Sequence, residues 1–443
     1  MECLQRKSSV TAGHPQSGSP LGEDVGARGR SHPLLVLGGA VLCLLSTWDF
    51  ALGIAPSALR ARAPTVQQGL LPEWLGCREI LHRRTPYRLE VTQQIELEIY
   101  GETVSANSPS NQHRFAYPVP FIFLFFPIAL LPFGVAQWAM LAACVALSAW
   151  SVGWWVDRAR LSKLDIAAFA VLTLAAYPTV VGLQLRQPTL IVAALLAFSV
   201  FCVRSDRLIL AGVVAALAAS QPQLAVTVLL PLSMWAMRSW RIRKAFVISL
   251  AASLLVLALA SELAVPGWVT PWLETIRAYS HYAGARPLLT DLIPEPFFIP
   301  AALLLLVAVA WVSFEFSNAD LLFSVSFSVA AFQLLFPFQI YNEVLLLPAA
   351  LWAAMNVDRI RERGQLPVLL FGCAWIALAS GWAATLALSL WDIAAPGSGV
   401  QLWQLPLVAA WLYPMLLFAA YATFAASSVL TRRQAHLASP VAA

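Results

Sequence analysis

Residues 297–316 read FFIPAALLLLVAVAWVSFEF, and Glu315 is the one charged side chain among them. A helix of about 20 mostly apolar residues is long enough to cross the hydrocarbon core of a lipid bilayer. Similar apolar runs recur along nearly the whole chain, in which 59% of the 443 residues are hydrophobic and 12% are charged. Soluble domains carry about 25% charged residues. The composition therefore excludes a water-soluble enzyme and predicts an all-α, multi-pass membrane protein.

The apolar segments predict the number of membrane spans. Thirteen segments are candidates: 34–55, 118–134, 136–156, 164–183, 189–203, 208–220, 222–237, 245–265, 297–316, 320–338, 340–356, 366–389 and 404–428. Segment 118–134 contains Pro118, Pro120, Pro127 and Pro132, which favours a re-entrant or interfacial piece over a full span. We therefore expect about twelve transmembrane helices, in a single domain over residues 33–430.

The basic residues predict the orientation. Lys and Arg number 28 and Asp and Glu 23, a small excess that gives no reason to expect nucleic-acid binding. Arg and Lys concentrate in four loops and after the last apolar run, at 158–163, 204–207, 238–244, 359–363 and 432–433. The positive-inside rule places these segments on the cytoplasmic side of the plasma membrane. Both ends are then cytoplasmic tails, residues 1–32, which we expect to be disordered, and residues 431–443.

This orientation gathers several polar segments on the outer face. They are the first outer loop, 57–116, the second large outer loop, 266–296, and the short turns 184–187, 220–223 and 341–343. Loops of such length are uncommon unless they have a function. We therefore expect an active site at the outer membrane surface.

Two stretches of the first outer loop have helical periodicity. In Pro72–Leu81, Trp74, Cys77 and Leu81 share one stripe, while Glu73 and Glu79 lie off it. In residues 89–100 the apolar positions recur every fourth residue, and Gly101 is placed to end the helix. We expect two interfacial helices that cover a cavity and present carboxylates to it.

The same loop resembles a known family. LPEWLGCREILHRRTPYRLEVTQQIELEIYG (71–101) and RFAYPVPFIFLFFPIALLPF (114–133) resemble the first outer loop and second hydrophobic segment of glycosyltransferase family 87. LQLRQPTLIVAALL (183–196) and AGVVAALAASQPQLAVTVLLPL (211–232), before the basic turn RSWRIRK (238–244), are similar to the downstream pattern of that family. The resemblance covers roughly residues 70–240.

The resemblance implies a GT-C-type hexosyl- or pentosyltransferase. Such an enzyme takes a sugar from a polyprenyl-phosphate donor and passes it, with inversion, to a hydroxyl of a cell-envelope glycan or glycolipid. A carboxylate of the first outer loop would act as general base, and Arg or Lys would stabilise the departing phosphate. The partners implied are the lipid-linked donor, the acceptor and membrane lipids.

Three carboxylates are candidates for the base. Asp49, in Trp-Asp-Phe at the outer end of the first span, resembles an Asp-Phe pair of the family, and Glu73 and Glu79 are the alternatives. For Asp49 the competing interpretation is a solvated residue at the end of the span, and for the two glutamates it is a solvated helix face. The chain departs from the family pattern at Gly69 and Thr85, where acidic residues are common, and at Gln221-Pro222, where relatives often have Lys-Pro.

Six residues are candidates for substrate binding. Arg186 lies in a tight outer turn and suits bidentate phosphate binding, although it could instead extend toward lipid headgroups. Gln187 and Gln223 could bind sugar hydroxyls or satisfy unpaired backbone groups at broken helices. In the second outer loop Arg277 and Arg286, with Tyr282, could hold the sugar phosphate, although an aromatic interface belt explains the tyrosine equally well.

The remaining motifs limit the other functions. The six cysteines include no CxxC pair, and GxGxxG, P-loop, HExxH, GxSxG and DxD motifs do not occur. We therefore expect no metal, and no cofactor besides the lipid-linked donor substrate. A transporter or lipid flippase would need ionisable residues near mid-membrane, for which Glu315 and Glu262 are the candidates. A catalytically inactive member that scaffolds envelope assembly is the other alternative.

Overall fold

The computed structural model describes residues 32–51, 69–104, 113–156, 161–282, 287–336, 339–395, 402 and 405–438. Within these ranges the chain is helical and forms no strand, which confirms the predicted all-α class. The elements are α1 (Pro33–Ala51), α4 (Leu71–Leu81), α5 (Leu89–Tyr100), η2 (Val119–Phe121), α6 (Ile122–Ala129), α7 (Phe133–Trp155), α8 (Lys163–Ala175), α9 (Tyr177–Gln184), α10 (Thr189–Arg204), α11 (Leu208–Ala218), α12 (Pro222–Arg238), α13 (Trp240–Ala264), α14 (Val269–Tyr282), α15 (Leu288–Leu292), α16 (Glu295–Phe316), α17 (Leu321–Leu335), η3 (Ile340–Leu346), α18 (Leu347–Met355), α19 (Val357–Arg361), α20 (Gln365–Ala377), α21 (Ser380–Ala394), α22 (Leu405–Ala410) and α23 (Leu412–Ala438).

Long apolar helices support a polytopic membrane protein. In the described ranges four segments are long and apolar enough to cross a bilayer: α7, α13, α16 and Val408–Thr431. The bent pairs α8–α9 (51°) and α20–α21 (42°) raise the number to six. Leucines such as Leu263 on α13 (80% exposed) and Leu304 on α16 (71%) face outward, as expected for side chains in contact with lipid.

The predicted count of about twelve spans is not supported. The other apolar helical segments counted in the described ranges have 10–17 residues, including Pro33–Trp48 of α1. At a rise of about 1.5 Å per residue, a helix of 11 residues such as α11 is about 16 Å long, against a hydrocarbon core of ~30 Å. Hydropathy marks these helices as apolar but does not measure how deeply they lie in the membrane. The segment 118–134 forms η2 and the eight-residue α6, followed by a turn into α7.

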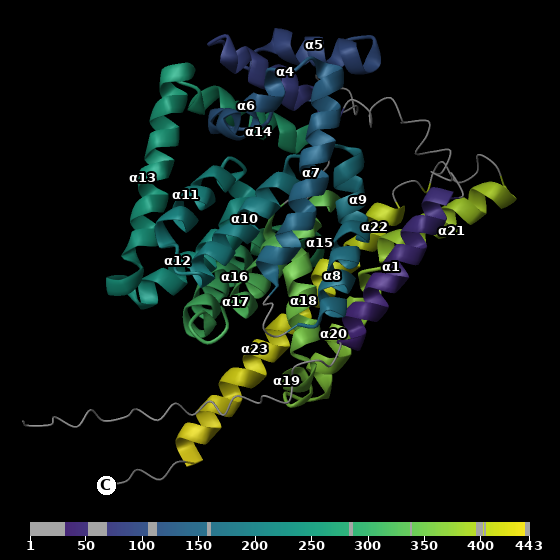
Figure 1. Cartoon of the computed structure of the whole chain (residues 1–443), viewed down its shortest axis with the longest axis vertical. Coiled ribbons are helices and arrows are strands. Elements are labelled where there is room, and N and C mark those ends of the chain that lie inside the picture. The colour runs from purple at the N-terminus through teal and green to yellow at the C-terminus, as the bar shows by residue number, and fades with distance from the viewer. Residues whose placement is uncertain are drawn as a thin grey trace, which may run out of the picture.

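The two large loops that were predicted to be outer meet at one end of the molecule. Figure 1 shows α4, α5, α6 and α14 gathered at the top. The indole of Trp272 in α14 donates a hydrogen bond to the carbonyl of Ala116 (3.1 Å), and that of Trp74 in α4 donates to the carbonyl of Leu131 (2.9 Å). The Tyr87 hydroxyl donates to the carbonyl of Tyr117 (2.8 Å). Residues of both loops therefore form one polar-edged layer, which we call the outer cap.

The two predicted helices of the first loop are confirmed, with one correction. They form α4 and α5, and Gly101 ends α5 in the left-handed conformation with a φ of 75°. Val91, Ile95 and Ile99 are buried, as their spacing predicted. The predicted apolar stripe of α4 holds only in part: Cys77 is buried and Trp74 half-buried, but Leu81 is 40% exposed, and Glu73, predicted to lie off the stripe, is 5% exposed. The stripe through Trp74 is thus not the only buried face of this helix.

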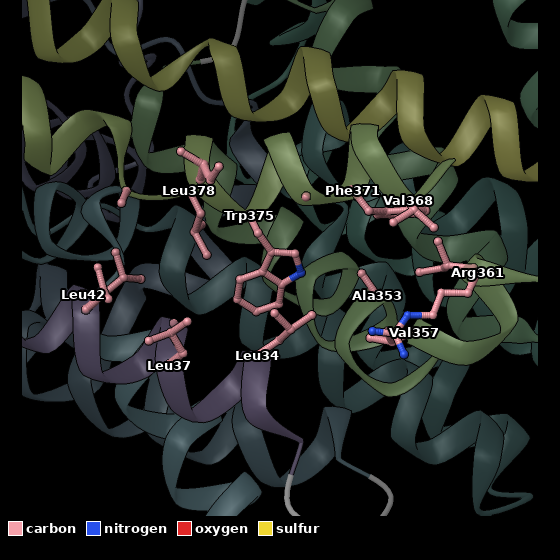
Figure 2. Close-up of a pocket in the computed structure, with 16 residues that line it drawn as sticks. Leu34, Leu37, Leu42, Ala353, Val357, Arg361, Val368, Phe371, Trp375 and Leu378 are labelled. Carbon is pink, nitrogen blue, oxygen red and sulfur yellow. The ribbon is translucent and has the colours of Figure 1, made fainter. Parts of the chain in front are cut away.

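Segments predicted to be cytoplasmic lie together at the other end. The backbone N–H of His32, just before α1, donates to the carboxylate of Asp165 in the first turn of α8 (2.6 Å). The helices are therefore parallel, and Gly39 allows close contact with the backbone of Ala168. Arg204, at the end of α10, donates to the carbonyl of Trp155, at the end of α7 (3.2 Å). Helix α1 also borders an apolar groove with α18, α19 and α20 (Figure 2).

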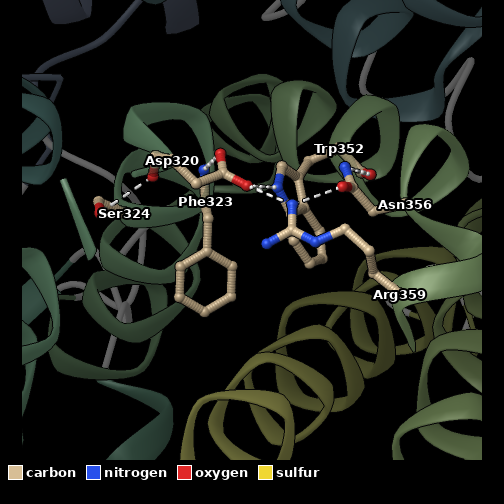
Figure 3. A network of polar contacts seen from close by, with 6 residues as sticks. All are labelled: Asp320, Phe323, Ser324, Trp352, Asn356 and Arg359. Atoms are coloured by element: carbon tan, nitrogen blue, oxygen red, sulfur yellow. Dashed lines mark hydrogen bonds and ion pairs between the residues drawn. The ribbon is translucent and has the colours of Figure 1, made fainter. Parts of the chain in front are cut away.

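A polar network joins the start of α17 to α18 and α19 (Figure 3). The Asp320 carboxylate caps α17 by accepting from the Phe323 N–H (3.0 Å). It also accepts from the indole of Trp352 (2.8 Å) and from Arg359 (2.9 Å). Trp352 is buried among aromatic rings, and its indole N–H has the Asp320 carboxylate as its hydrogen-bond partner in the described part of the chain. Asp320 therefore connects three helices through one side chain.

Asp320→Ala is expected to destabilise this end of the protein by about 2 kcal/mol, because it removes a helix cap and leaves a buried indole N–H unpaired. Thermal denaturation in detergent would show this as a lower midpoint. Asp358→Ala is the control, since its ion pair with Arg361 is long (3.5 Å) and exposed, and its midpoint should not change. Equal midpoints for the two variants would contradict the proposed role of the network.

Candidate functional site

Polar side chains converge where three helices are interrupted. The Thr189 hydroxyl, at the start of α10, lies 3.1 Å from Asn342 Oδ1 in η3 and 3.4 Å from Gln221 Oε1 just before α12. The Gln333 amide of α17 donates to the carbonyl of Asn342 (3.3 Å). These four residues and Glu343 are buried, and we call them the polar cluster. It joins residues from distant parts of the chain beneath the α9–α10 turn.

Local sequence explains these interruptions. Pro222 is the first residue of α12 and has no N–H to donate, so the chain leaves α11 and turns at Ser220 and Gln221. In η3 the chain forms a 3₁₀ helix before α18 continues from Leu347. Polar side chains at such breaks supply partners for backbone groups that a continuous helix would satisfy. The cluster is therefore a product of broken helices.

Helix α4 begins beside the α9–α10 turn. A Cβ atom at Gly69 would lie 2.9 Å from the carbonyl oxygen of Leu185, so the two backbones are in direct contact. Glu73 lies one helical turn further along the chain from Gly69. The first turn of α4 and the turn that holds Arg186 are therefore neighbours.

The α9–α10 turn holds Arg186 in an unusual conformation. The backbone N–H of Gln187 donates to the carbonyl of Gly182 (2.8 Å), and that of Arg186 donates to the carbonyl of Leu183 (3.2 Å). Many helices end in this pattern, with a residue in the left-handed conformation. Glycine usually occupies this position, but here Arg186 has a φ of 53°. Its Nη1 donates to the Gln184 carbonyl (2.8 Å). Among the described residues, Arg186 Nε and Gln187 Oε1 are buried without a hydrogen-bond partner.

Glu73 is a buried carboxylate in the outer cap. Tyr117 donates a hydrogen bond to its Oε1 (3.1 Å), and its Oε2 is buried with no partner in the described part of the chain. Burial disfavours the charged form and raises the pKa of Glu73 from 4.5 to about 7, against the opposing effects of backbone and Tyr117 hydrogen bonds. A carboxyl group with a pKa near neutrality can accept or release a proton under physiological conditions.

The family model for glycosyltransferase family 87 matches residues 115–338, half of the chain. The chain belongs to glycosyltransferase family 87. The match includes Thr189, Gln221 and Gln333 of the polar cluster, and Tyr117, the partner of Glu73. A comparison with curated proteins gives no match.

The other two candidate bases of this family 87 protein are placed differently. Glu79 forms ion pairs with Arg84 (2.8 Å) and Arg88 (3.9 Å), so its charge is already matched. Asp49 lies in the last turns of α1, but its side chain is outside what the structure describes. In Figure 1 this end of α1 lies beside α21 and away from α4 and α5.

The predicted substrate-binding residues do not all come together. Arg186 and Gln187 lie beside the polar cluster, whereas Gln223 is exposed, and Gln221 supplies the buried amide in its place. Arg277 is on the exposed side of α14. The side chain of Tyr282 and the whole of Arg286 fall outside the described residues.

The residues of the polar cluster were not predicted from the sequence. The sequence predicts that the turns 220–223 and 341–343 face the site, and Gln221 departs from the family pattern. Thr189, Gln333, Asn342 and Glu343 were not candidates. An amide or acid next to a predicted helix break inside an apolar run was the signal that could have identified Asn342 and Glu343.

Gly69→Ala is expected to lower sugar transfer by ~10–100-fold, because the new methyl group would displace α4 from Leu185 and shift Glu73 relative to Arg186. Initial rates at saturating donor would measure the loss. Gly134→Ala is the matched control, since a Cβ there has no neighbour within 4 Å. Unchanged transfer by Gly69→Ala would show that the contact does not position the site.

Proposed function

We propose that this membrane glycosyltransferase moves a sugar from a polyprenyl-phosphate donor to a hydroxyl of a cell-envelope glycan or glycolipid, with inversion at the anomeric carbon. The observation that supports this most is the position of Glu73, a buried carboxyl one turn from the Gly69–Leu185 contact and hence close to the Arg186 turn. A general base and a phosphate-binding cation are the two groups that this reaction requires.

In the proposed reaction, the oxygen of the acceptor hydroxyl attacks the anomeric carbon while Glu73 Oε2 takes the hydroxyl proton. The bond from the anomeric carbon to the phosphate oxygen breaks, and the electron pair leaves with the polyprenyl phosphate. The guanidinium of Arg186 stabilises the charge on that phosphate. Gln187 and the polar cluster, including Gln221 and Asn342, bind sugar hydroxyls.

The proposed orientation puts the outer cap on the non-cytoplasmic face of the plasma membrane. Both chain ends and the arginine-rich turns then face the cytoplasm, as the positive-inside rule requires. In this arrangement the lipid chain of the donor stays in the bilayer while its sugar phosphate reaches the cap. About twelve spans would require several of the shorter apolar helices to cross a locally thin or distorted membrane.

The two acids that would support a transporter lie near helix ends. Glu315 is next to the end of α16 and pairs with Arg238 (3.8 Å). Glu262, near the end of α13, accepts a hydrogen bond from the Gly267 N–H (2.7 Å). Acids of a transport pathway are expected near mid-membrane. Their positions favour the glycosyltransferase over a transporter or flippase.

Radiolabelled donors would test the proposed function. The full-length protein in liposomes is given a panel of polyprenyl-phosphate hexoses and pentoses together with a cell-envelope extract as acceptor. We expect one labelled sugar to appear in a glycan or glycolipid, with a new linkage of the opposite anomeric configuration. Movement of intact donor across the bilayer without transfer would indicate a flippase, and no turnover of any donor would indicate an inactive scaffold.

A further inference from the structure

An apolar groove lies on the flank of the molecule, away from the outer cap. It has a volume of about 520 Å³ and lies between α1, the α18–α19 segment and α20. Figure 2 shows Leu34, Leu37 and Trp375 around its centre, and Arg361 at one end. Arg361 is the one charged side chain among the lining residues. The groove has the composition of a hydrocarbon site with a cation at its end.

The length and position of the groove fit one leaflet of a bilayer. Its lining on α1 extends from Leu34 to Leu42, which corresponds to about 12 Å at a rise of about 1.5 Å per residue. Half of a hydrocarbon core of about 30 Å is about 15 Å. The end with Arg361 is the end where His32 meets Asp165 and where the arginine-rich segments gather. The groove therefore extends from that membrane surface toward the middle of the bilayer.

Arg361 is available for an anionic group. Its contact with Asp358 is long, 3.5 Å, and the two side chains are 68% and 93% exposed, so this ion pair is weak. The neighbouring Arg359 is held by Asp320 at 2.9 Å and does not line the groove. An arginine at the end of a hydrocarbon groove matches a lipid whose phosphate carries negative charge.

We propose that this groove binds one acyl chain of an anionic phospholipid, with the headgroup phosphate on Arg361. The site is separate from the proposed catalytic site, and its lipid comes from the leaflet opposite the outer cap. The bound chain fills a gap between α1 and α20, so it would contribute to the packing of α1 on the rest of the protein.

Photolabelling of the full-length protein in phosphatidylcholine vesicles would test the proposal. The probe is phosphatidylglycerol with a diazirine in one acyl chain, and the same label on phosphatidylcholine is the comparison. We expect phosphatidylglycerol to label peptides of α1 and α20, with about fivefold less labelling for Arg361→Gln. Arg241→Gln removes an exposed charge from the same end of the protein without touching the groove, and its labelling should match the wild type.

A substitution that fills the groove provides a second test. Gly372 of α20 lines the groove, and a Cβ there has no neighbour within 4 Å, so the side chain of Gly372→Leu begins in open space and the change also favours the helix. We expect Gly372→Leu to lose the label on α1 and α20, whereas Gly134→Leu in α7 keeps it. Equal labelling by both lipids would overturn the role of Arg361. Persistent labelling of Gly372→Leu would overturn the acyl-chain site. So would the finding that the wild type is a dimer and that Gly372→Leu dissociates it, because the groove would then be covered by a second copy of the chain.

Discussion

Glu73→Gln should lower sugar transfer by ~10²–10⁴-fold while making the protein more stable above neutral pH. The amide has nearly the same shape as the carboxyl and can still accept the Tyr117 hydrogen bond, but it cannot take a proton from the acceptor. Initial rates with the radiolabelled donor would measure the loss. Opposite effects on rate and stability are typical of a buried group retained for function.

The pH dependence follows from the pKa of Glu73, which is raised from 4.5 to about 7 by burial. Below pH 4.5 the carboxyl is neutral in the folded and the unfolded protein. Between pH 4.5 and 7 the folded protein binds the proton more tightly, so wild-type stability falls as the pH rises. Above pH 7 the variant should therefore be more stable by up to about 3 kcal/mol, and wild-type transfer should rise as the pH passes through about 7.

Two variants are controls for this prediction. Glu79→Gln breaks ion pairs whose arginine partners are about half exposed, so it should change stability by less than about 1 kcal/mol and transfer only slightly. Asp49→Asn should also keep transfer. Glu73 would be excluded as the base if its variant remained active, and would be structural if its variant lost both activity and stability.

Arg186→Gly should also separate activity from stability. Glycine adopts the φ of 53° without steric cost, so the folded protein should gain about 1 kcal/mol. Loss of the guanidinium should lower the rate of transfer by ~10²–10³-fold, the effect typical of removing one donor to a developing anion. Arg186→Lys keeps the charge but not the bidentate geometry. Its rate of transfer should lie between those of the wild type and Arg186→Gly. Thermal denaturation and initial rates would measure both effects.

Arg83 provides a matched control for Arg186. It has a φ of 56° at the end of α4. There the backbone N–H groups of Arg83 and Arg84 donate to the carbonyls of Ile80 and Glu79, which is the same pattern as in the α9–α10 turn. Arg83→Gly should give a similar gain in stability and leave transfer unchanged. Equal losses of transfer in both variants would trace the effect to the altered backbone and would contradict a role for the Arg186 guanidinium.

The sequence predicted local structure well where one periodicity dominated. The bounds of α4 and α5 followed from apolar spacing, and the end of α5 followed from Gly101. The burial of Glu73 did not follow, because a stripe through Trp74 accounts for only one face of α4. The opposite face is covered by Tyr117, a residue 44 positions away.

The number of spans and the polar cluster could not be predicted for related reasons. Hydropathy does not distinguish a short helix that crosses a membrane from one that packs at partial depth, and α10, α11 and α17 are all short. The contact between Thr189 and Asn342 joins residues 153 positions apart. No spacing rule brings together side chains from separate helix breaks, although the sequence did indicate that the breaks exist.

The hydrogen bond between Trp272 and Ala116 joins residues 156 positions apart, so the outer cap is completed late in biosynthesis. At about 5–20 residues per second, the ribosome needs ~8–30 s to make the chain between them. During that time α4 and α5 have emerged without the helix that completes their layer. A nascent chain arrested before α14 should therefore expose the first outer loop to protease, and chains released after α14 should protect it.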